Sequence, residues 1–86
     1  MRLVFTPQGW QDYIYWQTAD RAMVRRIDRL LDDAVRHPTG GIGKPEPLQY
    51  GIAGAWSRRI TDEHRLVYIV LGEDLVVLQC RYHYES

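Results

Sequence analysis

The chain has 86 residues, of which 45% are hydrophobic and 26% charged, and its formal net charge at neutral pH is zero. This length and composition predict one globular domain over residues 1–86 and exclude a disordered chain. The charge balance also excludes a protein that coats nucleic acid by bulk electrostatics, so any RNA contact should be local.

The first half of the chain predicts a short strand and two helices. Residues 3–5 are β-prone, and Thr6-Pro7 is a helix-start signal because threonine caps and proline fits the first helical position. Helical spacing of aromatic residues then continues to about Gln17. A second helix is predicted to begin at Asp20 and to end before Pro38. Its apolar residues have the spacing of one buried helix face: Met23, Val24, Ile27, Leu30, Leu31, Ala34 and Val35.

The second half predicts a loop and then a β-meander. Residues 39–54 hold five of the seven glycines, which indicates a loop with one short extended piece at residues 47–50. Strands are predicted over residues 55–60, 65–71 and 75–84. Because the turns between them are short, the pairing should be antiparallel. We therefore expect an α+β domain, with two helices on one face of an antiparallel sheet of four to five strands.

Several residue types limit the chemistry. Cys80 is the only cysteine, so no internal disulfide is possible. Neither Cys80 nor the histidines show metal-ligand spacing, and we expect no metal or cofactor. Trp10, Trp16 and Trp56 are interpreted as core aromatics. No segment approaches the length of a membrane span, and the first residues lack a secretory apolar region, so a cytoplasmic protein without membrane contact is expected.

A carboxylate and an imidazole are candidates for proton transfer. Glu46 stands between Pro45, whose own φ is fixed, and Pro47, which pushes Glu46 toward extended geometry. His83 lies one residue before the end of the last predicted strand. Glutamate and histidine can move protons, and a guanidinium can hold the charge that develops on phosphorus. These are the parts needed to cut a phosphodiester without a metal. A surface glutamate in a proline-rich turn and a merely exposed histidine are the plain alternatives.

Arginine dominates the cations, with ten arginines and one lysine. Arginine forks pair with phosphates at two points, although a solvated, salt-bridged helix face explains several of them equally well. Arg58, Arg59 and Arg65 fall on adjacent strands joined by a tight turn. Alternation places Arg58 and Arg59 on opposite faces, so one of them should face the helices or pack at a rim. Pairing with the turn acids Asp62 and Glu63 is the alternative role.

Five segments taken together resemble the YoeB/Txe toxins of the RelE-like toxin–antitoxin superfamily: residues 13–17, 43–48, 54–60, 63–68 and 80–84. The resemblance runs nearly end to end. It implies a RelE-like microbial-RNase fold and an endoribonuclease that enters the A site of the 70S ribosome and cuts mRNA there. It also implies control by a YefM/Axe-like antitoxin. We further expect a homodimer through the aromatic-rich first helix.

The resemblance also implies the site. It assigns catalytic roles to Glu46, Arg65, His83 and Tyr84, and RNA or phosphate contacts to Lys44, Arg58 and Arg59. The sequence departs from the family's pattern in two places. Gln49 stands where the family often has a basic residue, and Glu85-Ser86 follow the tyrosine at which familiar members end.

The expected mechanism needs no metal. The nucleophile should be the 2′-hydroxyl of the RNA, with Glu46 as the base that takes its proton. Arg65, helped by Arg59 and Lys44, would neutralise the transition state, and His83 would protonate the departing 5′-oxygen. The products would be a 2′,3′-cyclic phosphate, or the 3′-phosphate from its opening, and a 5′-hydroxyl. The alternative is a non-catalytic module of the same fold that binds RNA or an antitoxin.

Overall fold

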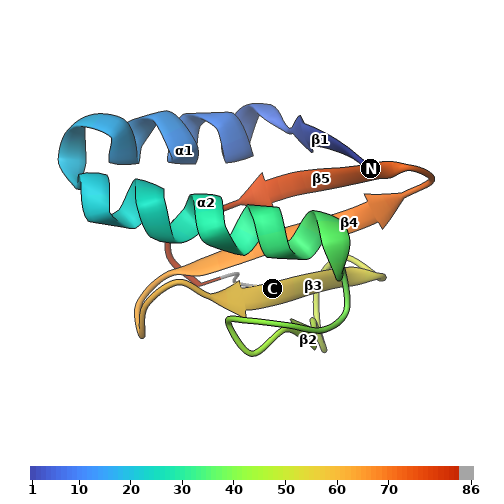
Figure 1. Cartoon of the computed structure of the whole chain (residues 1–86). Coiled ribbons are helices and arrows are strands. Elements are labelled where there is room, and N and C mark those ends of the chain that lie inside the picture. Colours follow the sequence, from blue (N-terminus) through green and yellow to red (C-terminus); the bar gives the residue numbers. More distant parts are fainter. Residues whose placement is uncertain (84–86) are drawn as a thin grey trace.

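A computed structural model describes residues 1–83, which form a pair of helices packed on one sheet (Figure 1). The elements in chain order are β1 (Arg2–Phe5), α1 (Pro7–Ala19), α2 (Arg21–Arg36), β2 (Glu46–Pro47), β3 (Ala55–Arg59), β4 (Arg65–Leu71) and β5 (Asp74–Gln79). The expected α+β class is confirmed. Within the described residues, no helix is long and apolar enough to cross a membrane.

The sheet is mixed, with the strand order β1-β5-β4-β3-β2. Strands β2 to β5 pair antiparallel, as the short turns predict. Strand β1 joins the edge parallel to β5, which the expectation of an antiparallel sheet did not include. In the sequence, the two helices come between β1 and the other strands. A connection of this length allows β1 to pair in parallel. At the start of β1, the Arg2 side chain donates to Asp74 at 2.7 Å.

Both helices begin at side-chain caps. The Thr6 hydroxyl accepts from the Gly9 amide at 3.1 Å, and Asp20 caps α2 by accepting from the Ala22 amide at 3.0 Å. Helix α1 continues to Ala19, slightly beyond the predicted end. Gly9 lets α1 approach β5 closely, because a Cβ atom there would lie 2.5 Å from the carbonyl oxygen of Val77.

The apolar face of α2 packs on the sheet and forms most of the core. Buried residues of this cluster are Trp16, Met23, Ile27, Leu30, Leu31, Ala34, Ile60, Leu66, Tyr68, Leu75, Val77 and Cys80. Trp56 is half-buried beside them. Trp10 does not join the core as expected. It is 50% exposed, and its ring stacks on Tyr13 and meets Phe5 edge-on at the surface.

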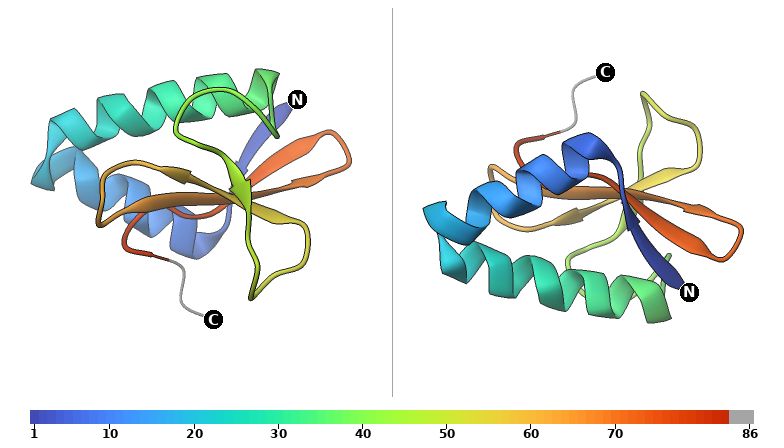
Figure 2. Two further views of the ribbon diagram at one scale, coloured as in Figure 1. Left: turned by 90° about the horizontal axis from the view of Figure 1, so that it is seen from below. Right: turned by 90° about the horizontal axis from the view of Figure 1, so that it is seen from above.

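The last strand ends earlier than predicted. Strand β5 stops at Gln79, and Tyr82 then takes a left-handed backbone conformation with φ of 62°. The chain thereby turns onto the sheet face opposite α2, as both views in Figure 2 show. Strand β2 begins at Glu46, one residue before the predicted extended piece. Residues 84–86 lie outside the described part of the chain.

Candidate functional site

The sheet face away from the helices carries three of the expected site residues. Arg58 faces the helices, so alternation turns Ser57 and Arg59 to the opposite face of β3. Glu46 pairs with Ser57 across β2 and β3, and Arg65 pairs with Arg59 across β3 and β4. Residues paired directly across an antiparallel ladder share a face. Glu46, Arg59 and Arg65 therefore lie together on this open face.

Arg58 corrects the expectation of an RNA contact, because its side chain is fully buried. Its guanidinium lies 2.5 Å from the Asp33 carboxylate and donates to the Tyr68 hydroxyl at 3.0 Å. It also donates to three backbone carbonyls, those of His37, Gly40 and Ile42. RNA cannot reach this side chain. Arg58 instead holds the loop after α2 against the sheet.

The same ion pair changes the titration of its partners. The Arg58 guanidinium, followed by the Ile42 amide, holds the pKa of Asp33 below its usual range. Burial raises the pKa of the Tyr68 hydroxyl, which donates to the carbonyl oxygen of Pro38 at 2.5 Å. Both groups thus keep the protonation state that their hydrogen bonds require.

Arg65 and His83 meet at the turn between β3 and β4. The Arg65 guanidinium donates to the carbonyl oxygens of Asp62 and His64, each at 3.1 Å. The Nε2 atom of His83 lies 2.9 Å from the same Asp62 oxygen. A carbonyl oxygen only accepts, so Nε2 of His83 carries the hydrogen. Among residues 1–83, no carboxylate forms an ion pair with Arg65, and its charge remains available.

Lys44 is held beside β3 by the loop that precedes it. The Gly43 carbonyl accepts from the Arg59 amide at 2.7 Å, and Gly43 and Lys44 both have positive φ. The chain then enters β2, where Glu46 is exposed at the sheet edge. The exposed Arg59 side chain lies 3.3 Å from the Asp62 carboxylate, a solvent-exposed pair that RNA can displace at little cost.

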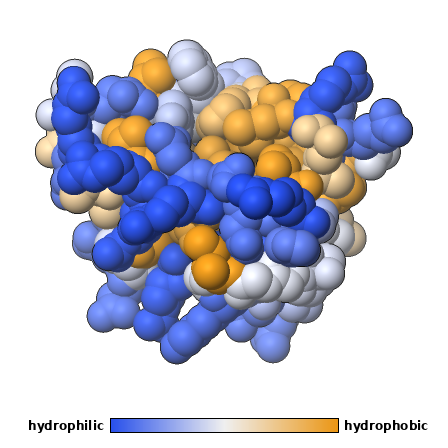
Figure 3. Space-filling view, in the orientation of Figure 1, coloured by the Kyte–Doolittle hydropathy of each residue, from blue (hydrophilic) through white to orange (hydrophobic). Residues whose placement is uncertain are grey.

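A cationic hollow of about 490 Å³ adjoins this loop. Four cations from α2, the loop and β3 line it: Arg26, Arg29, Lys44 and Arg59. Ile42, Gly43 and Ile60 also lie in its wall, and no acidic side chain within the described residues does. Such a surface attracts phosphate groups. Hydrophilic side chains cover much of the face drawn in Figure 3.

His64 holds the segment that presents His83, a role that the sequence did not indicate. His64 is 8% exposed, and its ring packs edge-on against Trp16, with 4.8 Å between ring centroids. Its Nδ1 atom accepts from the Tyr82 amide at 2.7 Å, and the Tyr82 carbonyl accepts from the Arg65 amide at 3.0 Å. The backbone N–H and C=O groups of Tyr82 are therefore both held by hydrogen bonds. The sequence placed His64 in the turn between two strands and carried no signal for these contacts.

The described residues contain no cluster of three His, Cys, Asp or Glu side chains that could hold a metal ion. Cys80 is buried, and burial raises the pKa of its thiol to about 12, so it is a poor nucleophile. The open face thus offers a carboxylate, an imidazole and several cations. These groups can transfer protons and stabilise a negatively charged transition state.

The sequence matches a family model along most of its length. The model describes a YoeB-like toxin of bacterial type II toxin–antitoxin systems and matches residues 5–84. Toxin YoeB of Escherichia coli K12 is 50% identical over 84 residues, which cover 98% of this chain and all of that protein.

Solved structures of YoeB toxins have the same fold as this chain. The YoeB/ParE toxin from Agrobacterium tumefaciens superposes with a TM-score of 0.93 and 53% identity, covering 98% of this chain and all of that one. YoeB in a heterotetrameric YoeB–YefM complex from Staphylococcus aureus superposes with a TM-score of 0.87 and 44% identity, covering 98% of both chains. A YoeB dimer from the same organism superposes with a TM-score of 0.90 and 44% identity, covering 98% of both chains. The fold expected from the resemblance is confirmed.

Proposed function

Because the chain belongs to the family of YoeB-like toxins of bacterial type II toxin–antitoxin systems, we propose that it is a metal-independent endoribonuclease that cuts mRNA in the A site of the 70S ribosome and so inhibits translation in the cytoplasm. One arrangement carries the proposal. Glu46, Arg59 and Arg65 share the open sheet face, and His83 lies at the adjoining turn.

In the proposed reaction, the 2′-oxygen of the RNA attacks the neighbouring phosphorus. Glu46 takes the proton from the 2′-hydroxyl, and His83 protonates the 5′-oxygen as it leaves. Arg65, with Arg59 and Lys44, stabilises the charge on the phosphorane-like transition state. Tyr84, which lies outside the described residues, is proposed to stack on or orient the substrate. Each proton transfer typically contributes about 10²–10⁴-fold to the rate.

The ribosome is the proposed scaffold for the substrate. The 2′-oxygen must lie in line with the leaving group, and this alignment contributes about 7–11 kcal/mol at best. Stacked RNA does not present this geometry. Glu46 and Arg59 are exposed at the protein surface, so the protein alone has few walls at these residues that could distort free RNA. We therefore expect weak cleavage of RNA away from the ribosome.

A YefM/Axe-like antitoxin is the proposed partner, since the related S. aureus toxin forms a YoeB–YefM complex. An apolar hollow of about 370 Å³ between β1 and α2 is a candidate docking surface for such a protein. Its apolar wall consists of Leu3, Phe5, Tyr13, Leu31 and Val35. Figure 3 shows apolar surface in the region between the helices and β1.

A homodimer is also proposed, since the S. aureus relative forms one. Trp10, Ile14 and Tyr15 of α1 are 50%, 44% and 41% exposed, which supports contact through this helix. Light scattering at several concentrations tests this part. We expect the mass of two chains at the concentration at which the protein binds ribosomes, and one chain there would argue against a functional dimer.

Mapping mRNA fragments from programmed ribosomes tests the reaction. We expect a 5′-hydroxyl on the downstream fragment, and a single 2′-deoxy substitution just upstream of the cut should block cleavage. Glu46→Gln and His83→Gln should each slow cleavage by about 10²-fold or more. Glu73→Gln and His37→Gln change exposed residues outside the site and serve as matched controls. A 5′-phosphate would show that water attacks instead, and intact mRNA with bound protein would favour a non-catalytic module.

A further inference from the structure

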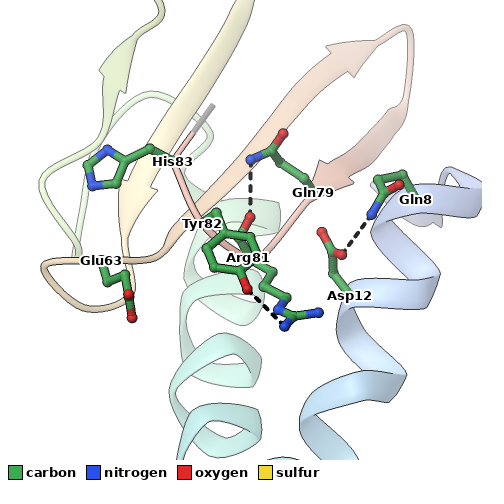
Figure 4. Close-up of a pocket in the computed structure, with 7 residues that line it drawn as sticks. All are labelled: Gln8, Asp12, Glu63, Gln79, Arg81, Tyr82 and His83. Carbon is green, nitrogen blue, oxygen red and sulfur yellow. Dashed lines mark hydrogen bonds between the residues drawn. The ribbon is translucent and has the colours of Figure 1, made fainter. Parts of the chain in front are cut away.

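A polar hollow of about 680 Å³ lies beside His83 (Figure 4). It extends from the segment after β5 to the first turns of α1, and its walls include Gln8, Asp12 and Gln79. The hollow lies within the reach of a ligand held at His83, and its volume falls in the usual range of about 300–1,000 Å³ for small-molecule sites. It differs in composition from the cationic hollow at Lys44.

The order of the strands places this hollow on the side of the site where His83, the proposed general acid, lies. Strand β2 with Glu46 is at one edge of the sheet, β4 with Arg65 lies centrally, and β5 with Gln79 lies beyond it. In the proposed reaction, the base acts on the upstream ribose and the acid acts on the 5′-oxygen of the downstream nucleoside. The downstream nucleoside therefore leaves on the side of His83, next to the hollow.

Two amides in the wall have fixed orientations. Nε2 of Gln8 donates to the Asp12 carboxylate at 2.8 Å, and Nε2 of Gln79 donates to the Arg81 carbonyl at 3.3 Å. A carboxylate and a carbonyl only accept, so both amides must turn their nitrogen toward the protein. Within residues 1–83, the Oε1 atoms of Gln8 and Gln79 accept no hydrogen bond. Both oxygens are therefore free to accept a hydrogen bond from a ligand.

The remaining groups favour a base over a phosphate. Asp12 and Glu63 place carboxylates in the wall, which repel a phosphate. The cation nearby, Arg81, is already engaged: its guanidinium lies 3.7 Å from the Tyr15 ring centroid and donates to the Tyr82 hydroxyl at 2.9 Å. The hollow is therefore rich in acceptors and suits a ligand with N–H donors.

We propose that this hollow binds the base of the nucleotide directly downstream of the cut, and that the Oε1 atoms of Gln8 and Gln79 accept from its exocyclic amino group. This inference rests on the proposed ribonuclease function and adds its base preference. Adenine, guanine and cytosine carry an exocyclic amino group, whereas uracil does not. Uridine should be the poorest nucleotide at this position.

The test compares adenosine with purine riboside, which lacks only the amino group, at the downstream position. Single-turnover cleavage is measured on programmed ribosomes. Each net hydrogen bond to the amino group is worth about two- to tenfold, so the unmodified protein should cut purine riboside at least about twofold more slowly. The difference should disappear in the Gln8→Ala/Gln79→Ala double variant. Gln11→Ala changes an exposed glutamine of the same helix and should retain the difference.

Two results would overturn the inference. Equal rates for both nucleotides with the unmodified protein would show that no group reads the amino function. An unchanged difference in the double variant would show that the ribosome or another residue reads it. Circular dichroism checks the fold of the double variant, and Gln79→Ala alone, which leaves α1 intact, takes its place if the double variant does not fold.

Failure of the ribonuclease proposal is distinguishable from failure of this inference. If the unmodified protein cuts neither mRNA, the ribonuclease function is wrong. Affinity is then measured on ribosomes that carry mRNA with a 2′-deoxy nucleotide upstream, which needs no catalysis. Binding that is at least about twofold weaker with purine riboside, a difference lost in the double variant, supports a base site in the hollow. Equal binding, or a difference that persists in the double variant, excludes this site.

Discussion

The guanidinium of Arg65 and the imidazole of His83 lie against the same carbonyl oxygen, that of Asp62, at 3.1 Å and 2.9 Å. The two candidate catalytic side chains are thereby held at one point by the backbone of a turn. Arg65 also holds this segment through its amide, which donates to the Tyr82 carbonyl at 3.0 Å. Displacement of either side chain should therefore disturb the other.

The loss of cleavage rate on removing both side chains should be smaller than the two single losses combined. Arg65→Gln and His83→Gln should each slow cleavage by about 10²-fold or more, because each removes a group from one transition-state arrangement. The double variant should be at most about tenfold slower than the slower single variant. Single-turnover rates on programmed ribosomes measure this. Losses that simply multiply would show that the two residues act independently.

His64→Phe should weaken the presentation of His83. Phenylalanine keeps the packing on Trp16 but removes the Nδ1 acceptor of the Tyr82 amide. An unpaired amide costs about 1–3 kcal/mol, so stability in urea should fall by that amount and cleavage should fall with it. Glu63→Gln, which alters only the exposed partner of His64, is the control and should change stability by less than about 1 kcal/mol. Normal cleavage by His64→Phe would show that His64 does not position His83.

Arg58→Met should destabilise the fold and leave the chemistry of the folded fraction intact. The substitution leaves Asp33 and three backbone carbonyls without their shared donor. Removal of one partner of a buried pair typically costs about 3–5 kcal/mol, and partial exposure of Asp33 suggests about 3 kcal/mol here. Urea unfolding measures the change. Arg59→Met, one residue along and exposed, is the matched control and should barely affect stability. A loss below about 1 kcal/mol would contradict the structural role of Arg58.

The stability that Asp33 contributes should disappear in acid. Its pKa in the folded chain is below the ordinary value of 3.8, chiefly because Arg58 donates to the carboxylate. The contribution is therefore complete above about pH 4–5 and is lost as the pH falls through the folded-state pKa. Melting temperatures of the unmodified protein and Asp33→Asn should differ at pH 5 and draw together as the pH falls below 3.8. A constant difference over this range would show that the charge of Asp33 is not responsible.

Local signals in the sequence were sufficient for most elements. The apolar stripe of α2 predicted the face that packs on the sheet, and Thr6 and Asp20 cap the helices as their residue types suggest. The bounds of β4 were predicted correctly because turn residues flank it on both sides. The expected open-face residues Glu46 and Arg65 followed from the resemblance, and their roles in cleavage remain predictions.

The errors come from contacts between distant segments. The alternating pattern continues past Gln79, but the Tyr82 amide binds His64 and turns the chain away from the sheet. Alternation likewise predicted that one of Arg58 and Arg59 faces the helices or packs at a rim, but only the position of Asp33 on α2 decides which one faces the helices. No local pattern contains these partners, because each lies many residues away along the chain.

The parallel contact of β1 with β5 has a consequence for the order of folding. It joins Arg2 to Asp74, which are 72 positions apart, whereas β3, β4 and β5 pair through short turns. Because closing a long loop is entropically costly, we expect the meander and the helical pair to form first and β1 to dock after the transition state. Phe5→Leu should then speed unfolding and leave the refolding rate nearly unchanged in stopped-flow experiments. Slower refolding would place β1 in the nucleus.

If β1 does dock last, the first strand to be synthesised is the last to pair with the sheet. Until it pairs, β5 has an unpaired edge that can associate with other chains.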